Sequence, residues 1–191
     1  MTSTSRRGHD RTEAIMRTML ELGRETGYAR LSIEAVARRA GVGKHTVYRR
    51  WTSKGALLLD SLLSLHRHDL DYPDTGDVRA DLRAQIHRVA DLMTAPPFGP
   101  LFRALVAEAQ HDPDVATALH AQFTRPQEER TVARLNTARD RGELSPDFDL
   151  DLAMAILSGP LYFRFLITRE PLTHEYVDQV LDALFAGMGP R

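Results

Sequence analysis

A glycine turn between two short amphipathic segments constrains the fold of this chain more than any other feature of its sequence. The first segment, residues 33–40, repeats its apolar residues at helical spacing, and Ser32 stands directly before it, where a serine side chain can cap a helix. Gly41 follows, and glycine adopts the left-handed backbone conformation that commonly ends a helix. Two short helices joined by a turn that contains glycine are typical of a helix-turn-helix motif.

The second segment, residues 44–51, is apolar on one side and cationic on the other. If it is helical, a step of about 100° per residue places Val47 and Trp51 on one side. His45 and Arg49 then lie on the opposite side. Such a helix can pack on a small core while its cationic side enters a DNA groove lined with phosphates. The alternative is a solvated surface helix, but the shared direction of the cations favours a recognition helix.

The stretch from Ile15 to Leu58 resembles the DNA-binding domain of the TetR family of bacterial transcriptional regulators. The matching residues are Ile15, Met19, Leu22, Gly27, Tyr28, Ser32, Val36, Ala37, Ala40, Gly41, Val42, Lys44, Thr46, Val47, Tyr48, Trp51, Ser53, Lys54, Ala56 and Leu57. The chain departs from the family pattern at Gly23, Gly43 and Gly55, and Trp51 keeps the aromatic character of its position but replaces the usual phenylalanine. Gly43 stands where the family usually has serine or threonine, so we expect a weaker side-chain cap on the recognition helix.

The resemblance and the outward placement of the side chains together predict the contacts with double-stranded operator DNA. We expect Lys44, His45 and Arg49 to meet base edges or adjacent phosphates. The remaining predicted DNA-binding residues, which chiefly hold phosphates, are Ser32, Thr46, Tyr48 and Lys54.

The charge distribution supports nucleic-acid binding by the first part of the chain. The net charge of the whole chain is −1, yet residues 1–55 carry 12 lysines and arginines against 5 acidic residues. The remainder carries 13 against 21. Because residues 1–55 are basic and the remainder is acidic, the electrostatic attraction for DNA is concentrated in residues 1–55.

Several kinds of site are not indicated by the sequence. Cysteine is absent, the histidines lack metal-ligand spacing, and neither a Gly-x-Ser-x-Gly motif nor a glycine-rich phosphate loop is present. We therefore predict no cofactor, no metal and no enzyme activity. The N-terminus lacks the apolar core of a signal peptide and no apolar run is long enough for a membrane span, so we expect no membrane partner and a cytoplasmic protein.

The fold class predicted is all-α, because apolar residues recur at helical spacing throughout and strand-like alternation is missing. We expect a three-helix DNA-binding domain that contains the helix-turn-helix motif and a larger helical ligand-binding and dimerisation domain, about nine helices in all. The boundaries expected are 1–53 for a basic, disordered arm and the DNA-binding domain, 54–71 for a connecting helix, and 72–191 for the larger domain. We expect Pro126 to break or kink the helix that begins at Pro113.

Two further sets of residues are assigned to the larger domain. Aromatic and sulfur-containing side chains predict a ligand pocket, with plain core packing as the alternative; they are Met93, Phe98, Phe102, Phe123 and Tyr162. The helix 150–168 is apolar on nearly every side, so a second copy of the chain is expected to cover one face of it and of the helix 173–186. The predicted dimer residues are Leu152, Ile156, Phe163, Ile167, Val180 and Leu184.

These observations predict a DNA-binding transcriptional regulator. The resemblance implies a repressor that binds a pseudo-palindromic operator as a homodimer and responds to a small-molecule effector. The alternative is a helical small-molecule-binding protein or enzyme with a basic N-terminal module.

Overall fold

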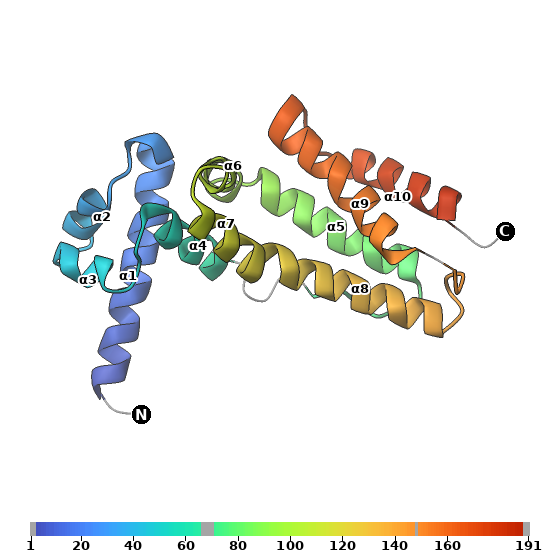
Figure 1. Cartoon of the computed structure of the whole chain (residues 1–191), viewed down its shortest axis with the longest axis horizontal. Coiled ribbons are helices and arrows are strands. Elements are labelled where there is room, and N and C mark those ends of the chain that lie inside the picture. The colour runs from blue at the N-terminus through green and yellow to red at the C-terminus, as the bar shows by residue number, and fades with distance from the viewer. Residues whose placement is uncertain (1–2, 66–70, 148, 189–191) are drawn as a thin grey trace. The chain divides into compact units, whose positions relative to one another are not determined.

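The computed structural model describes residues 3–65, 71–147 and 149–188, and all regular structure in these ranges is helical (Figure 1). The helical run from α7 through η2 to α8 is unbroken, as is the run from α9 to η3. Counted in this way, the described residues hold nine helices, which confirms the predicted fold class. The chain divides into two compact units, residues 1–67 with 95–121 and residues 68–94 with 122–191.

The first unit is built on a long helix that begins earlier than expected. Its elements are α1 (Ser3–Thr26), η1 (Tyr28–Arg30), α2 (Ile33–Arg39), α3 (Lys44–Tyr48), α4 (Lys54–Leu65), α6 (Phe98–Ala109) and α7 (Pro113–Leu119). The helix α1 already begins at Ser3, so residues 3–9 of the N-terminal stretch expected to be a disordered arm are helical. The last part of the predicted connecting helix 54–71, residues 66–70, lies outside the described residues.

A core of long apolar side chains joins α1 to α4, and α4 also packs on α6 and α7. Met19 on α1 and Leu57 and Leu58 on α4 are completely buried in it. A Cβ atom on Gly23 would lie 2.8 Å from Leu101 Cδ2, so Leu101 occupies the space of the bulky residue that the resemblance predicts at Gly23. The segments α6 and α7, which the sequence assigned to the larger domain, therefore pack within the first unit.

The second unit is a bundle in which each of four helices contacts two others. Its elements are α5 (Val78–Thr94), α8 (Arg125–Asp140), α9 (Leu150–Tyr162), η3 (Phe163–Thr168) and α10 (His174–Met188). Helix α10 packs on α5 and α9, and α8 packs on the same two helices. The core contains Leu82 of α5, Leu135 of α8, Leu157 of α9 and Leu181 of α10.

A buried ion pair ties α5 to α8 inside this bundle. The guanidinium of Arg134 donates to Asp81 Oδ2 from Nε at 2.8 Å and from Nη2 at 2.6 Å. Thr75 also donates to the Asp81 carboxylate, and Glu143 accepts from the Val78 amide at 2.7 Å. Burial opposes ionisation of Asp81, but the hydrogen bonds from Thr75 and Arg134 outweigh it and lower the pKa of this carboxyl.

Two π-helical segments lie beside prolines. η2 (His120–Thr124) comes just before Pro126, and η3 follows Pro160. Proline lacks an N–H group and its ring collides with the carbonyl four residues earlier, which for Pro126 is that of Gln122, so the wider turn of η2 relieves the helix there. The helical run continues through Pro126, so the predicted alternatives of a break or a kink reduce to a local distortion, the π-helical segment η2.

Candidate nucleic-acid interface and ligand pocket

The helix-turn-helix forms because each boundary residue satisfies a local requirement. Ser32 Oγ accepts from the Ala35 amide at 3.1 Å and caps α2. Gly41 adopts a φ of 67°, and the Val42 amide then donates to the Ala37 carbonyl at 3.0 Å. A side chain at Gly41 would be strained by this backbone conformation, not by lack of space.

Helix α3 is short and held by two buried side chains. Val47 is completely buried and Trp51 is 2% exposed, with its Nε1 donating to Asp60 Oδ2 at 2.8 Å on α4. Gly43 stands at the N-cap without a side-chain hydrogen bond, which confirms the weaker cap expected from the sequence. The helix ends at Tyr48, although helical hydrogen bonding continues to Trp51.

The face of α3 opposite Val47 is cationic and exposed. Lys44, His45 and Arg49 are all exposed, and none of them forms an ion pair within the residues that the structure describes. Arg39 of α2, in contrast, pairs with Glu25 at 2.7 Å. Thr46 is half-buried. The exposed cations are therefore available to an anionic partner without first breaking an internal ion pair.

Tyr48 and Ser32 are also exposed and present hydroxyl groups. The Tyr48 hydroxyl donates to Glu34 at 3.3 Å, and partial desolvation together with the Glu34 carboxylate raises the pKa of Tyr48. Tyr48 therefore remains a neutral donor at physiological pH. The Ser32 hydroxyl uses only its acceptor role in capping α2, so its proton can still be donated.

Lys54, like Tyr48 and Ser32, has partners within the protein. Its ammonium lies 4.0 Å from the centre of the Tyr28 ring and donates to the Tyr28 carbonyl at 3.3 Å. The Tyr28 hydroxyl in turn donates to Glu108 of α6, and burial and this hydrogen bond raise the pKa of Tyr28. The sequence analysis did not identify Tyr28 and Glu108 as partners, since they are 80 residues apart.

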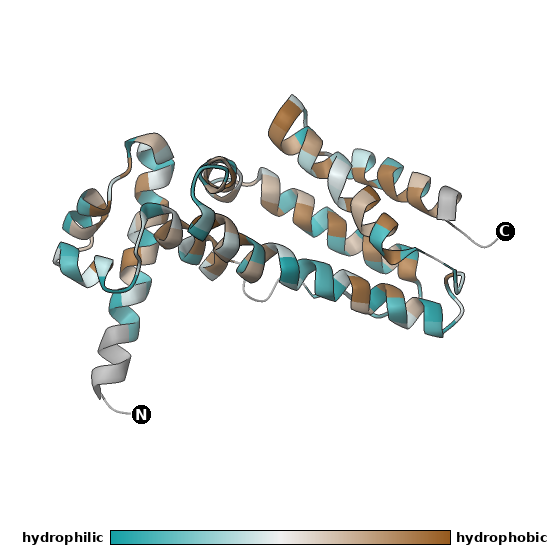
Figure 2. Ribbon diagram, in the orientation of Figure 1, coloured by the Kyte–Doolittle hydropathy of each residue, from teal (hydrophilic) through white to brown (hydrophobic). Residues whose placement is uncertain are grey.

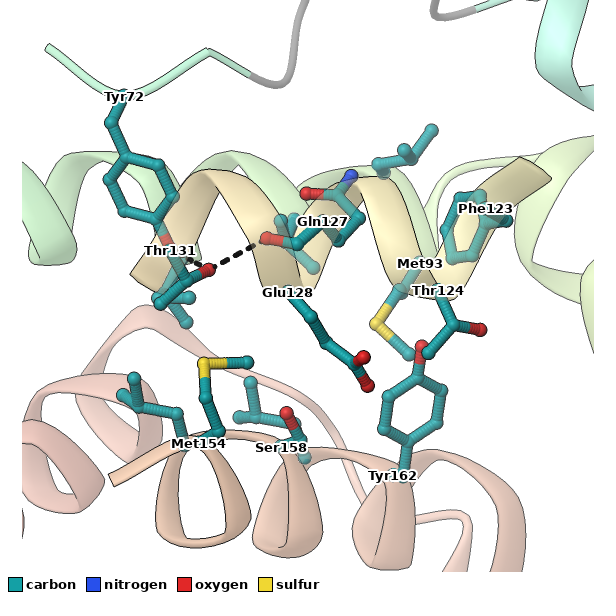
Figure 3. A pocket seen from close by; sticks show the side chains of 15 residues that line it. Tyr72, Met93, Phe123, Thr124, Gln127, Glu128, Thr131, Met154, Ser158 and Tyr162 are labelled. Carbon is teal, nitrogen blue, oxygen red and sulfur yellow. Dashed lines mark hydrogen bonds between the residues drawn. The ribbon is translucent and has the colours of Figure 1, made fainter. Parts of the chain in front are cut away.

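The second unit contains a cavity of about 310 Å³. Its lining residues are Tyr72, Ile86, Val89, Leu92, Met93, Phe123, Thr124, Gln127, Glu128, Thr131, Met154, Leu157, Ser158, Leu161 and Tyr162. Figure 3 shows the Glu128 carboxylate pointing into the space between α8 and α9, on the side of Tyr162. Tyr72 and Thr131 are joined through their hydroxyls at 2.9 Å.

Three of the five predicted pocket residues, Met93, Phe123 and Tyr162, line this cavity. Phe98 and Phe102 do not, because both are core residues of α6 in the first unit, each 2% exposed. Their prediction as lining residues is wrong for this cavity. The sequence analysis also missed a polar stripe at helical spacing, which a search for aromatic residues alone overlooks: Thr124, Gln127, Glu128 and Thr131.

The predicted dimer residues lie mostly on one exposed face of α9 and η3. Leu152, Phe163 and Ile167 are 50%, 57% and 68% exposed. The half-buried residues of the set are Ile156 and Val180. Leu184 is completely buried within its own unit, so its assignment to an interface is wrong; its neighbour Ala183 is the exposed residue.

The helix-turn-helix motif of this chain exposes a cationic face on its second helix, which is typical of DNA-binding proteins. Residues 15–60 match the family model of bacterial regulatory proteins of the tetR family. Residues 72–184 match the model of the tetracyclin repressor-like C-terminal domain. The chain therefore belongs to the TetR family and is a DNA-binding transcriptional regulator. Because this family consists of regulators, the expectation of a protein that is not an enzyme is confirmed.

Known transcriptional regulators are similar to this protein over nearly the whole chain. An uncharacterised HTH-type transcriptional regulator of Mycobacterium tuberculosis is 33% identical over 90% of this chain and 84% of its own length. A DNA-binding transcriptional repressor, TetR, of Mycobacteroides abscessus is 29% identical over 92% of both chains. The crystal structure of the TetR family transcription regulator SCO0332 has a TM-score of 0.78 and 38% identity, covering 94% of this chain and 98% of that one.

Proposed function

We propose that the protein is a ligand-responsive repressor that binds a pseudo-palindromic operator as a homodimer. The observation that carries this proposal is the exposed cationic face of α3 opposite the buried residues Val47 and Trp51. The repressor that is 29% identical over 92% of this chain supports repression as the output. A protein that regulates transcription from bacterial DNA acts in the cytoplasm, which is the compartment we assign.

The proposed DNA contacts divide into two classes. Lys44, His45 and Arg49 meet base edges or adjacent phosphates in the major groove, because all three are exposed and His45 and Arg49 project from the face opposite Val47. The residues that hold the DNA backbone are Ser32, Thr46, Tyr48 and Lys54. Lys54 has three N–H donors and gives one to the Tyr28 carbonyl, so donors remain for a phosphate.

The apolar face of α9 and η3 supports a homodimer. Although Asp151 and Arg164 interrupt its apolar run, the stretch 150–168 is the one helical stretch in the described part of the chain with the length and composition of a membrane span. Only 22% of its most apolar part is buried. Figure 2 shows α9 as largely hydrophobic beside the more hydrophilic α8. An exposed apolar stretch of this kind favours burial against a second copy of α9 and α10, as in a four-helix bundle.

The cavity in the second unit supports a small-molecule effector. At about 310 Å³ it lies at the lower end of the range of ligand sites in proteins. In the proposed mechanism, the bound effector changes the separation of the two recognition helices in the dimer. The two operator half-sites then no longer match both helices, and the repressor is released.

Footprinting on the DNA upstream of the gene for this protein tests the proposal. We expect a protected region with two-fold symmetric half-sites, because a two-fold dimer presents two identical copies of α3. Protection of a single asymmetric half-site would contradict the proposal that the protein binds its operator as a homodimer. Absence of protection anywhere, with equal affinity for unrelated DNA, would favour the alternative of a helical small-molecule-binding protein.

A further inference from the structure

The lining of the cavity in the second unit carries a negative charge and no positive charge. Its lining contains one carboxylate, that of Glu128, and no lysine, arginine or histidine. An anionic ligand would therefore lose hydration without gaining an ion pair, whereas a cationic ligand would meet a carboxylate. The composition of the lining selects against negatively charged effectors before any detail of shape is considered.

The Glu128 carboxylate has no cationic partner within the described part of the chain. The two arginines nearest to it in sequence are engaged elsewhere, Arg125 with Glu129 at 2.8 Å and Arg130 with Asp71 at 3.1 Å. Glu128 is itself exposed, so water hydrates its carboxylate in this state. A ligand ammonium can replace that water without displacing a side chain of the protein.

Aromatic and sulfur-containing side chains surround the same space. Figure 3 places Tyr162 and Phe123 at the end of the cavity near Met93, with Met154 farther along α9. Ring faces attract cations, and methionine adapts its shape to apolar groups. Burial and the nearby charge of Glu128 raise the pKa of Tyr162 to about 12, so its hydroxyl stays neutral and adds no second negative charge.

We propose that the effector is an organic cation, with a protonated amine that pairs with Glu128 and an apolar or aromatic body that fills the rest of the cavity. This inference rests on the proposed function, since it names the chemical class of the ligand for that site. Two lining residues on α9, Tyr162 and Ser158, carry hydroxyl groups. In the proposed complex these hydroxyls can accept hydrogen bonds from the ligand amine.

Isothermal titration calorimetry with three matched probes tests the charge preference. The probes are 2-(1-naphthyl)ethylamine, 2-(1-naphthyl)ethanol and 1-naphthylacetate, which share an aromatic body and carry a positive, neutral and negative head group. We expect the amine to bind at least about fivefold more tightly than the alcohol, and the acetate to bind most weakly, because a charge-assisted hydrogen bond adds to the common burial of the ring. Absence of amine binding, or tighter binding of the acetate, would overturn the proposal.

The variant Glu128→Gln isolates the role of the carboxylate. Because glutamine has the same shape and the residue is exposed, we expect a folded protein that binds the alcohol as before and loses the preference for the amine. The matched control Glu175→Gln removes an exposed carboxylate outside the cavity and should leave the preference intact. An unchanged preference in Glu128→Gln would also overturn the proposal. Binding of upstream DNA by the ligand-free protein is measured separately, so failure of the ligand class and failure of the DNA-binding function give different results.

Discussion

At the scale of single residues, Lys54 combines a structural and a proposed functional role. Its ammonium rests on the Tyr28 ring and bonds to the Tyr28 carbonyl, and Tyr28 is hydrogen-bonded to Glu108. These contacts fix the position of a side chain that would otherwise sample many rotamers. A fixed cation loses less conformational entropy when it binds a phosphate.

The variant Lys54→Met keeps much of the apolar stem and removes the charge. We expect weaker binding to all DNA sequences alike, and a slope of log affinity against log salt that is smaller by about one, since one phosphate contact is lost. Fluorescence anisotropy at several salt concentrations measures both quantities. An unchanged salt slope would exclude a phosphate contact by Lys54.

At the scale of elements, the two glycines of the helix-turn-helix differ in backbone conformation, so their substitutions should change the stability in opposite directions. Gly41 has a φ of 67°, so Gly41→Ala should lower the free energy of unfolding by about 1 kcal/mol. Gly43 has a φ of −68° and open space around it, so Gly43→Ser should supply the missing cap and stabilise by about 0.3 kcal/mol. Thermal unfolding of the two variants tests this pair, and destabilisation by Gly43→Ser would contradict the assignment of the N-cap.

The ion pair between α5 and α8 makes the second unit sensitive to acid. Asp81→Asn leaves the buried Arg134 guanidinium with the Glu143 carboxylate, 3.3 Å from Nη2, as its remaining counter-charge and should cost about 2 kcal/mol. The folded-state pKa of Asp81 is lowered, so the stability from its ionisation is present above the unfolded pKa of about 3.9 and is lost as the pH falls through the folded value. Chemical denaturation across this pH range should therefore show the difference between wild type and Asp81→Asn shrinking on acidification. A difference that is independent of pH would contradict this role.

Local signals in the sequence predicted the elements better than they predicted the packing between them. Ser32, Gly41 and Gly142 mark helix boundaries because caps and left-handed turns depend on a few adjacent residues. The packing of α6 and α7 on α4 depends on contacts between distant segments, and so Phe98 and Phe102 were assigned to the wrong environment. Leu184 and Ala183 differ by one step of the helix, which apolar periodicity alone does not resolve.

At the scale of the whole molecule, binding of a pseudo-palindromic operator as proposed requires two copies of the chain. Phe163 and Ile167 are more than half exposed, and burial of such a side chain contributes roughly 1.5–3 kcal/mol. A few of them per subunit can outweigh the entropy lost on association. The bonds of Arg164 to Glu170 and to the Pro171 carbonyl satisfy the one cation within this apolar stretch.

The double variant Phe163→Glu with Ile167→Glu should therefore be monomeric and lose operator affinity, because one subunit carries only one reader of a half-site. Sedimentation measures the assembly, and anisotropy measures the affinity. The control Ala133→Glu places a charge on an exposed position of α8, the next candidate for an interface, and should remain dimeric. A dimeric double variant together with a monomeric control would move the interface to α8.

The central claim, that the cationic face of α3 binds DNA, is tested most directly by titrating labelled upstream DNA with wild type, Arg49→Ala and Arg125→Ala at one fixed salt concentration. Arg49 is the exposed C-cap residue of α3 and forms no ion pair in the described residues, whereas Arg125 is an exposed arginine of α8 that pairs with Glu129. We expect Arg49→Ala to weaken binding by about tenfold to a hundredfold and Arg125→Ala to bind as wild type does. Equal affinities for Arg49→Ala and wild type would contradict the claim.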